Sequence, residues 1–147
     1  MVDLPPSILR PLFDAKLRRG AVIRLKEYPL RLGPAPKYFI ALNVDCSQPY
    51  IYHALTTSNV DRYQKLAFAD DGVFIPQGKV SALSLPTIVD CHQLYFPLQR
   101  TRLFEYFCAK TLEINDPLPP DLMREIDAIL RRNRHIAQAV KAIILPG

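Results

Sequence analysis

The sequence predicts a protein of the α+β class that is mainly β, with a short N-terminal helix, a run of strands and a C-terminal helix. Between residues 21 and 96, apolar side chains alternate with polar ones or form short continuous runs, as they do in strands. After Pro120 the apolar residues recur every three or four positions, which is the period of a helix. A chain of 147 residues fits one domain, residues 1–147, with a sizeable core.

The first half of the chain predicts one helix and three strands. Apolar residues at helical spacing indicate a helix over 7–19, and alternation indicates a strand over 21–28. Three prolines and a glycine make 29–36 a stiff loop. The apolar run 37–45 is typical of a central strand covered on both faces, and 50–57 follows a short turn as its antiparallel partner.

The second half predicts two further strands, a mixed segment and the closing helix. Residues 73–78 form a short strand interrupted by a proline, and a β-branched run indicates a strand over 86–96. The aromatic-rich segment 101–114 is predicted as a strand or a mixed segment. From Pro120 one helix, bent near residues 132–135, closes the chain.

The composition indicates a folded, soluble protein with an excess of positive charge. Hydrophobic residues make up 49% and charged residues 22%, both near the average for globular domains. The net charge of +5 favours polyanions and acidic proteins as partners. No window approaches the roughly 18–20 apolar residues of a membrane span, and the start MVDLPPSILRPLF lacks the basic and apolar regions of a signal peptide. We therefore expect a cytoplasmic location and no membrane partner.

The cysteines and the absence of common catalytic motifs reduce the number of reaction types that the sequence supports. Cys46, Cys91 and Cys108 are odd in number and lack CxxC spacing, which predicts reduced thiols rather than disulfides or a metal site. Glycine-rich nucleotide loops, HExxH and GxSxG are absent, so we expect no cofactor. Cys91 and His92 are neighbours on a predicted strand and point to opposite faces, which predicts one core and one surface residue rather than a catalytic pair.

Short motifs occur along the chain in a distinctive order. GAVIRL (20–25) opens the first strand, and GPAPKYFIALN (33–43) joins a stiff loop to an apolar strand. HALTTS (53–58) ends the next strand, and LPTIVD (85–90) follows after a variable segment. In this order, over roughly residues 20–145, the sequence resembles the MazF/PemK toxin family.

The resemblance implies a fold, an activity and partners. The fold is a small SH3-like β-barrel with a C-terminal helix, and the usual assembly is a homodimer. The activity is cleavage of single-stranded RNA by an endoribonuclease that needs no metal and is neutralised by an acidic antitoxin protein. The arginine and threonine at the core of the family's RNA-cleaving site correspond here to Lys37 and Thr56. A cation there stabilises charge that develops as the 2′-hydroxyl attacks, and a hydroxyl hydrogen-bonds the phosphate oxygens.

The sequence departs from the family pattern around this site. Lys37 keeps the charge of the usual arginine but not its planar, two-pronged contact with phosphate. The proline that follows the arginine and the acidic residue of the preceding loop are absent. Arg31, in the same loop, could supply the missing guanidinium, and His53 could transfer protons. The other predicted substrate contacts are Tyr38, Thr57 and Ser58.

Each of these residues also has a structural interpretation. The polar residues 56–59 are common turn residues that satisfy backbone groups locally. A histidine such as His53 is more often a hydrogen-bonded strand residue than a base, and alternation puts it on the face opposite Thr56. The alternative function is therefore a non-catalytic binding module on the same barrel, which engages an acidic protein or RNA. Lys37 favours this alternative, and the threonine motif favours the ribonuclease.

Overall fold

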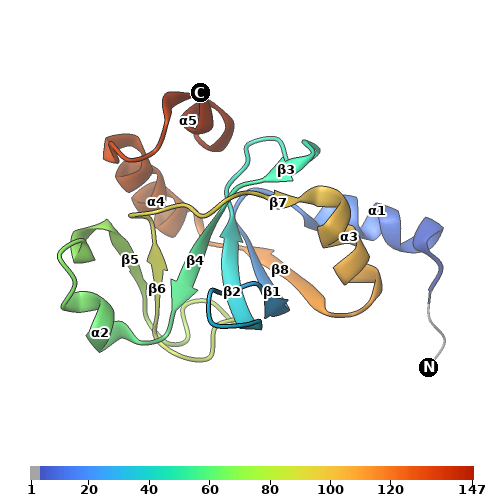
Figure 1. Ribbon diagram of the computed structural model, residues 1–147, viewed down its shortest axis with the longest axis horizontal. Coiled ribbons are helices and arrows are strands. Elements are labelled where there is room, and N and C mark those ends of the chain that lie inside the picture. The colour runs from blue at the N-terminus through green and yellow to red at the C-terminus, as the bar shows by residue number, and fades with distance from the viewer. Residues whose placement is uncertain (1–3) are drawn as a thin grey trace.

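The computed structural model describes residues 4–147 as a β-sheet flanked by helices (Figure 1). The strands are β1 Ala21–Tyr28, β2 Ala35–Ala41, β3 Tyr50–Ile51, β4 His53–Thr57, β5 Gly72–Ile75, β6 Thr87–Asp90, β7 Leu98–Gln99 and β8 Leu112–Pro117. The helices are α1 Pro6–Lys16, α2 Val60–Gln64, α3 Arg100–Cys108, α4 Pro120–Arg132 and α5 Gln138–Ile144, with a 3-10 turn, η1, at Ala69–Asp71. The predicted domain and the N-terminal segment include residues 1–3, which lie outside the described residues.

The main sheet has six antiparallel strands in the order β5-β6-β4-β2-β1-β8, and β3 pairs separately with β7. The predicted antiparallel partnership of the apolar strand is confirmed, because Phe39 of β2 lies opposite Leu55 of β4. The α+β class is also confirmed. Helices take a larger share than the prediction of a mainly β protein allowed, since α2 and α3 form where no helix was expected. Within residues 4–147, no strand pairing joins the sheet edges β5 and β8.

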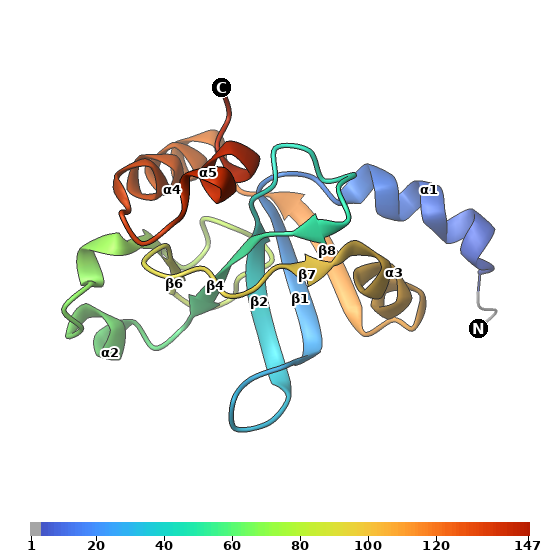
Figure 2. The same cartoon turned by 45° about the horizontal axis from the view of Figure 1, so that its top comes forward.

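Apolar side chains pack on both faces of the sheet. Val22 and Ile40 contact a core that includes buried residues of α4 and α5, whereas Ile23 and Phe39 contact a core that includes buried residues of α1 and α3. Consecutive strand residues point to opposite faces, so β1 and β2 supply both cores. Figure 2 shows the two pairs of helices at opposite ends of the sheet. This double coverage explains the apolar run in β2 and confirms that it is a central strand.

The N-terminal helix ends earlier than predicted, at Lys16 rather than residue 19. Leu17 is extended and buried, and the chain then turns into β1. The Arg19 side chain donates hydrogen bonds to the carbonyls of Leu42 and Ile144 and pairs with Asp127 of α4. These contacts tie the start of the sheet to the C-terminal helices and hold Arg19 outside the helix.

Segment 101–114, predicted as a strand or a mixed segment, is mixed, with the helix α3 followed by the strand β8. The rings of Phe104 and Phe107 in α3 lie 5.2 and 5.5 Å from the ring of Phe13 in α1. The chain then turns at Lys110, whose φ of 62° lies in the left-handed region, and continues as the edge strand β8. Aromatic residues suggested a strand, but here they form one packed face of a helix.

The predicted strands 50–57 and 86–96 are both shorter than expected. Tyr52 separates β3 from β4, so that segment contributes to two sheets. After β6 ends at Asp90, residues 91–97 leave the sheet and cross β4 and β2 on the way to β7 (Figure 1). The carbonyls of Cys91 and His92 accept hydrogen bonds from the side chain of Asn133 and not from a strand, which explains why β6 stops there.

The closing helix is divided into α4 and α5 by residues 133–137. The expected bend is therefore a complete interruption, at the predicted place. The apolar face of α4 is buried within the chain, with Ile126 and Leu130 fully inaccessible. No helix among residues 4–147 has the length and apolar character needed to cross a membrane.

A leucine truncation tests how much α4 contributes to stability. Leu130→Ala leaves a cavity in the core, so the free energy of unfolding in urea should fall by about 2–5 kcal/mol. Leu32→Ala is the matched control, because Leu32 is 100% exposed and its truncation should change stability by less than about 0.5 kcal/mol. Equal effects of the two substitutions would contradict the packing of α4 against the sheet.

Candidate nucleic-acid interface

Five of the predicted site residues line one hollow of about 230 Å³. They are Lys37, Tyr38, Thr56, Thr57 and Ser58. β2 supplies the first two, and the end of β4 with its following turn supplies the others. The hollow forms because β2 and β4 are neighbours in the sheet, and residues around the start of β6 line its other side. The structure therefore brings these residues of the two motifs together.

The hydroxyl of Thr56 is engaged within the protein. Its Oγ1 donates to the carbonyl oxygen of Tyr38 at 3.0 Å, and the residue is buried. The Nζ of Lys37 donates to the carbonyl oxygen of Thr56 at 3.5 Å. An ammonium has three N–H donors, so others stay available to a ligand. Thr56 therefore joins β4 to β2 and positions Lys37, while Lys37 carries the charge of the hollow.

The turn after Thr56 has a structural role as well. The backbone N–H of Asn59 donates to Thr57 Oγ1 at 3.1 Å, and the side-chain oxygen of Asn59 accepts from the N–H of Arg62 at 3.3 Å. Asn59 is thus the N-cap of α2. The structural interpretation of the polar cluster holds for these residues. Ser58 is exposed at the rim of the hollow.

A second hollow, of about 250 Å³, adjoins the first. Lys37 lines both, so it lies at their border. Arg62 adds a second cation to this hollow, and Tyr63, Phe68 and Tyr95 add aromatic rings. Cations beside aromatic faces suit a sugar-phosphate chain with unpaired bases.

The carboxylate in the second hollow, that of Asp90, is hydrogen-bonded to a tyrosine. The hydroxyl of Tyr63 donates to Asp90 Oδ1 at 2.9 Å. Burial and this hydrogen bond raise the pKa of Tyr63, so the hydroxyl keeps its proton at neutral pH. The pair stabilises the contact of α2 with β6 and is not available for proton exchange with a ligand.

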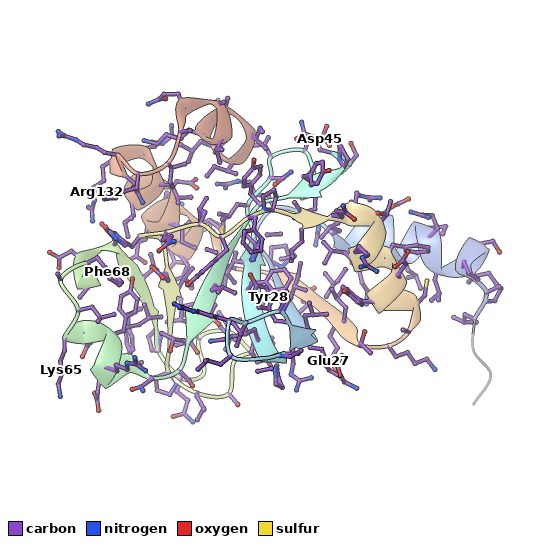
Figure 3. The ribbon with its side chains drawn as sticks, viewed as in Figure 1. Glu27, Tyr28, Asp45, Lys65, Phe68 and Arg132 are labelled. Carbon is purple, nitrogen blue, oxygen red and sulfur yellow. The ribbon has the colours of Figure 1, made fainter. Side chains whose placement is uncertain are left out.

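Arg31 and His53 do not join the other predicted site residues. Arg31 is exposed in the loop between β1 and β2 and lines neither hollow. His53 is fully buried, and its Nε2 lies 2.6 Å from the hydroxyl of Tyr28, a residue that Figure 3 shows near the middle of the molecule. Its ring also contacts that of Phe39 at 4.9 Å. From this position His53 cannot touch a ligand at Lys37, so the expected proton transfer is not supported.

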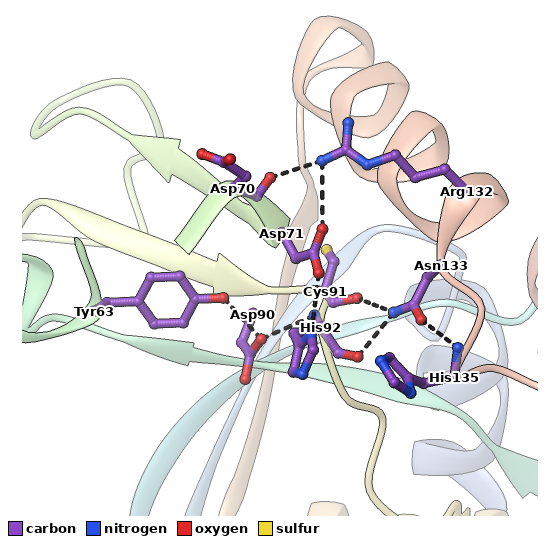
Figure 4. A network of polar contacts seen from close by, with 9 residues as sticks. All are labelled: Tyr63, Asp70, Asp71, Asp90, Cys91, His92, Arg132, Asn133 and His135. Carbon is purple, nitrogen blue, oxygen red and sulfur yellow. Dashed lines mark hydrogen bonds and ion pairs between the residues drawn. The ribbon is translucent and has the colours of Figure 1, made fainter. Parts of the chain in front are cut away.

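A polar network that the sequence analysis did not predict lies at the end of β6 (Figure 4). His92 Nδ1 is 2.9 Å from Asp71 Oδ2, and Arg132 of α4 contacts both Asp71 and the carbonyl oxygen of Asp70. Burial of Cys91 and partial exposure of His92 confirm the predicted division into a core and a surface residue. The partners of His92 come from distant parts of the chain, so no motif or spacing could have indicated them.

Asn133 extends this network to a second histidine. Its side-chain nitrogen donates to the carbonyls of Cys91 and His92, each at 2.8 Å, and its side-chain oxygen accepts from the N–H of His135 at 2.8 Å. The rings of His92 and His135 are 5.2 Å apart as a result. Among residues 4–147, no group of three or more histidine, cysteine or acidic side chains is placed to hold a metal ion.

No protein-family model and no curated protein matches this sequence.

The pH dependence of stability tests the burial of His53. Burial lowers the pKa of His53 from 6.5 to about 4, so below pH 6.5 the unfolded chain binds a proton that the folded chain does not bind until about pH 4. This contribution to stability is complete above pH 6.5 and is lost as the pH falls towards 4. When the pH is lowered from about 7 to about 5, the free energy of unfolding in urea should fall by about 2 kcal/mol more in the wild type than in His53→Gln. Equal losses in the two proteins would contradict a buried, neutral His53.

Proposed function

We propose that this protein is an endoribonuclease that binds and cleaves single-stranded RNA, as its resemblance to MazF/PemK toxins implies. The observation that carries the proposal is the convergence of Lys37 and the turn at Thr56–Ser58 on one hollow, beside a second hollow with Arg62 and three aromatic rings. Lys37 binds a backbone phosphate, and the aromatic side chains stack on unpaired bases.

The physical chemistry of the hollows suits this ligand. A lysine ammonium binds phosphate as a point charge, and each base stacked on an aromatic ring contributes about 1–3 kcal/mol. The net charge of +5 attracts a polyanion from a distance. Because the two hollows meet at Lys37, an extended strand can pass from one to the other over the same cation.

Thr56 has an indirect role in the proposed site. Its hydroxyl proton is directed to the Tyr38 carbonyl, and its own carbonyl accepts from Lys37. Thr56 is therefore a positioning residue for the lysine in this account. The SH3-like barrel is part of the same proposal, and the antiparallel strand order and the irregular register of β1 between Leu25 and Tyr28, which bends a strand, support it.

A second candidate function is a binding module without catalysis, which holds RNA or an acidic protein on the same surface. One observation favours it. No histidine lines the two hollows at Lys37, and the carboxylate there, Asp90, is bonded to Tyr63. RNA cleavage needs groups that exchange protons with the reacting oxygens, so these two hollows alone explain binding better than chemistry.

Substitution of Lys37 separates the two functions. Lys37→Ala removes the cation at the phosphate and should slow cleavage of a long unstructured RNA by about 10²–10³-fold. Lys37→Arg restores a charged, two-pronged contact and should match or exceed the wild type. For binding to single-stranded RNA, Lys37→Ala should reduce the slope of log affinity against log salt by about 0.7.

Lys16→Ala is the matched control, because Lys16 lies on α1 and lines neither hollow at Lys37. Its salt slope and cleavage rate should equal those of the wild type. If the wild type cleaves no RNA but binds it with the Lys37-dependent slope, the binding module is correct. If Lys37→Ala has the same slope and rate as the wild type, the phosphate site is wrong.

The resemblance also implies a homodimer and an acidic antitoxin that covers the basic surface. The apolar face of α4 is buried within the chain, so it does not supply a dimer interface. A different surface supports a dimer now, because Leu4, Ile8 and Leu12 are exposed at four-residue spacing along the N-terminal segment and α1.

Sedimentation equilibrium tests the dimer. The wild type should be dimeric at micromolar concentration, and Ile8→Glu should shift it to monomers because a charge on the apolar stripe must be desolvated in the interface. Glu105→Gln, at an exposed position of α3, is a control that should leave the association unchanged. A monomeric wild type would refute the homodimer without affecting the RNA site.

A further inference from the structure

A third hollow, of about 610 Å³, continues the row that begins at Lys37. It is bordered by His92 and His135, and it includes the exposed rings of Tyr95 and Phe96. Tyr95 also lines the second hollow, so the second and third hollows adjoin in the same way as the first and second. The three hollows therefore form a row that extends from Lys37 to the two histidines.

His92 is held in one orientation at the edge of the third hollow. Its ring stacks on Phe68, with centroids 4.1 Å apart and planes 6° from parallel. Its Nδ1 contacts the carboxylate of Asp71, and a carboxylate can only accept, so Nδ1 carries the proton. Nε2 of the neutral ring is then an acceptor, and Figure 4 shows the ring extending away from Asp71, beside His135.

The second imidazole is brought to the first by the buried side chain of Asn133. That one amide bonds the carbonyl of His92 and the N–H of His135, and thereby fixes both backbones. His135 is exposed and lines the same hollow. Two imidazoles, with ring centroids 5.2 Å apart and planes 68° from parallel, therefore border one hollow, and a carboxylate orients one of them. Imidazole is the side chain most often used as a general acid or base.

We propose that His92 and His135 are the acid-base pair that cleaves single-stranded RNA, with the scissile phosphate in the third hollow and another phosphate of the same strand on Lys37. The inference rests on the proposed function and supplies the proton-transfer groups that the two hollows at Lys37 lack. It divides the site into a binding part at Lys37 and a reacting part at the histidines.

The reaction balances with these two groups. His92 Nε2 takes the proton of the 2′-hydroxyl as the 2′-oxygen bonds to phosphorus, and the bond from phosphorus to the 5′-oxygen breaks. Protonated His135 gives its proton to the leaving 5′-oxygen. The products are a 2′,3′-cyclic phosphate and a free 5′-hydroxyl. His92 is the base because the carboxylate of Asp71 stabilises the imidazolium that forms.

Charged and titratable groups from several elements lie near the two histidines, and they influence how the proposed reaction depends on pH. The hydrogen bond from His92 lowers the pKa of Asp71, so this carboxylate stays charged through neutral pH. The groups around His92 are Asp71 at η1, Tyr63 of α2, Asp90 and Cys91 at the end of β6, Arg132 of α4, and His135. With one base and one acid, the rate should rise and then fall with pH.

The test measures cleavage and binding separately in His92→Gln and His135→Gln. Saturated cleavage rates should fall by about 10²–10⁴-fold in each, whereas binding to a 2′-fluoro oligonucleotide, which cannot be attacked, should change less than about twofold. The low-pH limb of the rate profile should disappear in His92→Gln. His135 is exposed, so His135→Gln should fold. This holds even if His92→Gln is destabilised by the loss of its contact with Asp71. Gln138→Ala, an exposed neighbour that does not line the hollow, should retain the wild-type rate.

The possible outcomes separate this inference from the proposed function. If the wild type cleaves RNA and both histidine variants keep its saturated rate, the acid-base pair is refuted and the ribonuclease stands. Weaker binding with an unchanged saturated rate also refutes the catalytic role. A wild type that cleaves no RNA at any pH between about 5 and about 9 refutes the pair and the ribonuclease together.

Discussion

The buried side chain of Asn133 is the contact on which the site end of the molecule depends. It ends α4, takes the carbonyls of Cys91 and His92 away from the sheet, and fixes the N–H of His135. A buried amide that satisfies three backbone groups is costly to replace, because an apolar side chain would leave each of them unpaired. The hydrogen bonds of Asn133 therefore join the turn after α4 to the end of β6 and to the start of the crossing segment 91–97.

The row of hollows is a consequence of that arrangement. Because the chain leaves β6 at Asp90, Tyr95 lies over the second hollow and His92 borders the third. The sheet supplies Lys37 and Tyr38 from β2 and the threonines at the end of β4. In the proposed account, binding of the RNA backbone and proton transfer thus belong to different parts of the fold, joined by aromatic side chains on which bases can stack.

The resemblance to MazF/PemK toxins and the departures from it have a common explanation in this account. Lys37 stands where the family has an arginine, and the hydroxyl of Thr56 donates its hydrogen bond to the Tyr38 carbonyl. Both features reduce the hydrogen bonds that the motif can offer to a reacting phosphate, but the positive charge that attracts phosphate remains. In the proposed mechanism, His92 and His135 are the acid and base in place of groups at the motif.

The resemblance proposed Lys37 and Thr56 as site residues, and their proximity in the structure follows from the pairing of their strands. Residues 42–52, which include the short strand β3, connect β2 to β4, and these two strands pair directly, so the motifs on them lie side by side. The C-terminal helical period was equally clear. By contrast, His92 and Asp71 are 21 residues apart and meet only through tertiary packing. The sequence left the role of His53 open because its burial depends on Tyr28 and Phe39, which are distant in the chain. It left the helix α3 unresolved because aromatic residues suit both strands and helices.

The central claim is that one strand of RNA lies across all three hollows, from Lys37 to the two histidines. The most direct measurement is an NMR titration of the protein with a 2′-fluoro oligoribonucleotide, which binds but cannot react. The account predicts that amide and imidazole shifts change together at Lys37, Tyr95, His92 and His135, with one dissociation constant for all four. Changes confined to α1 and β8, or shifts at Lys37 without shifts at the histidines, would contradict it.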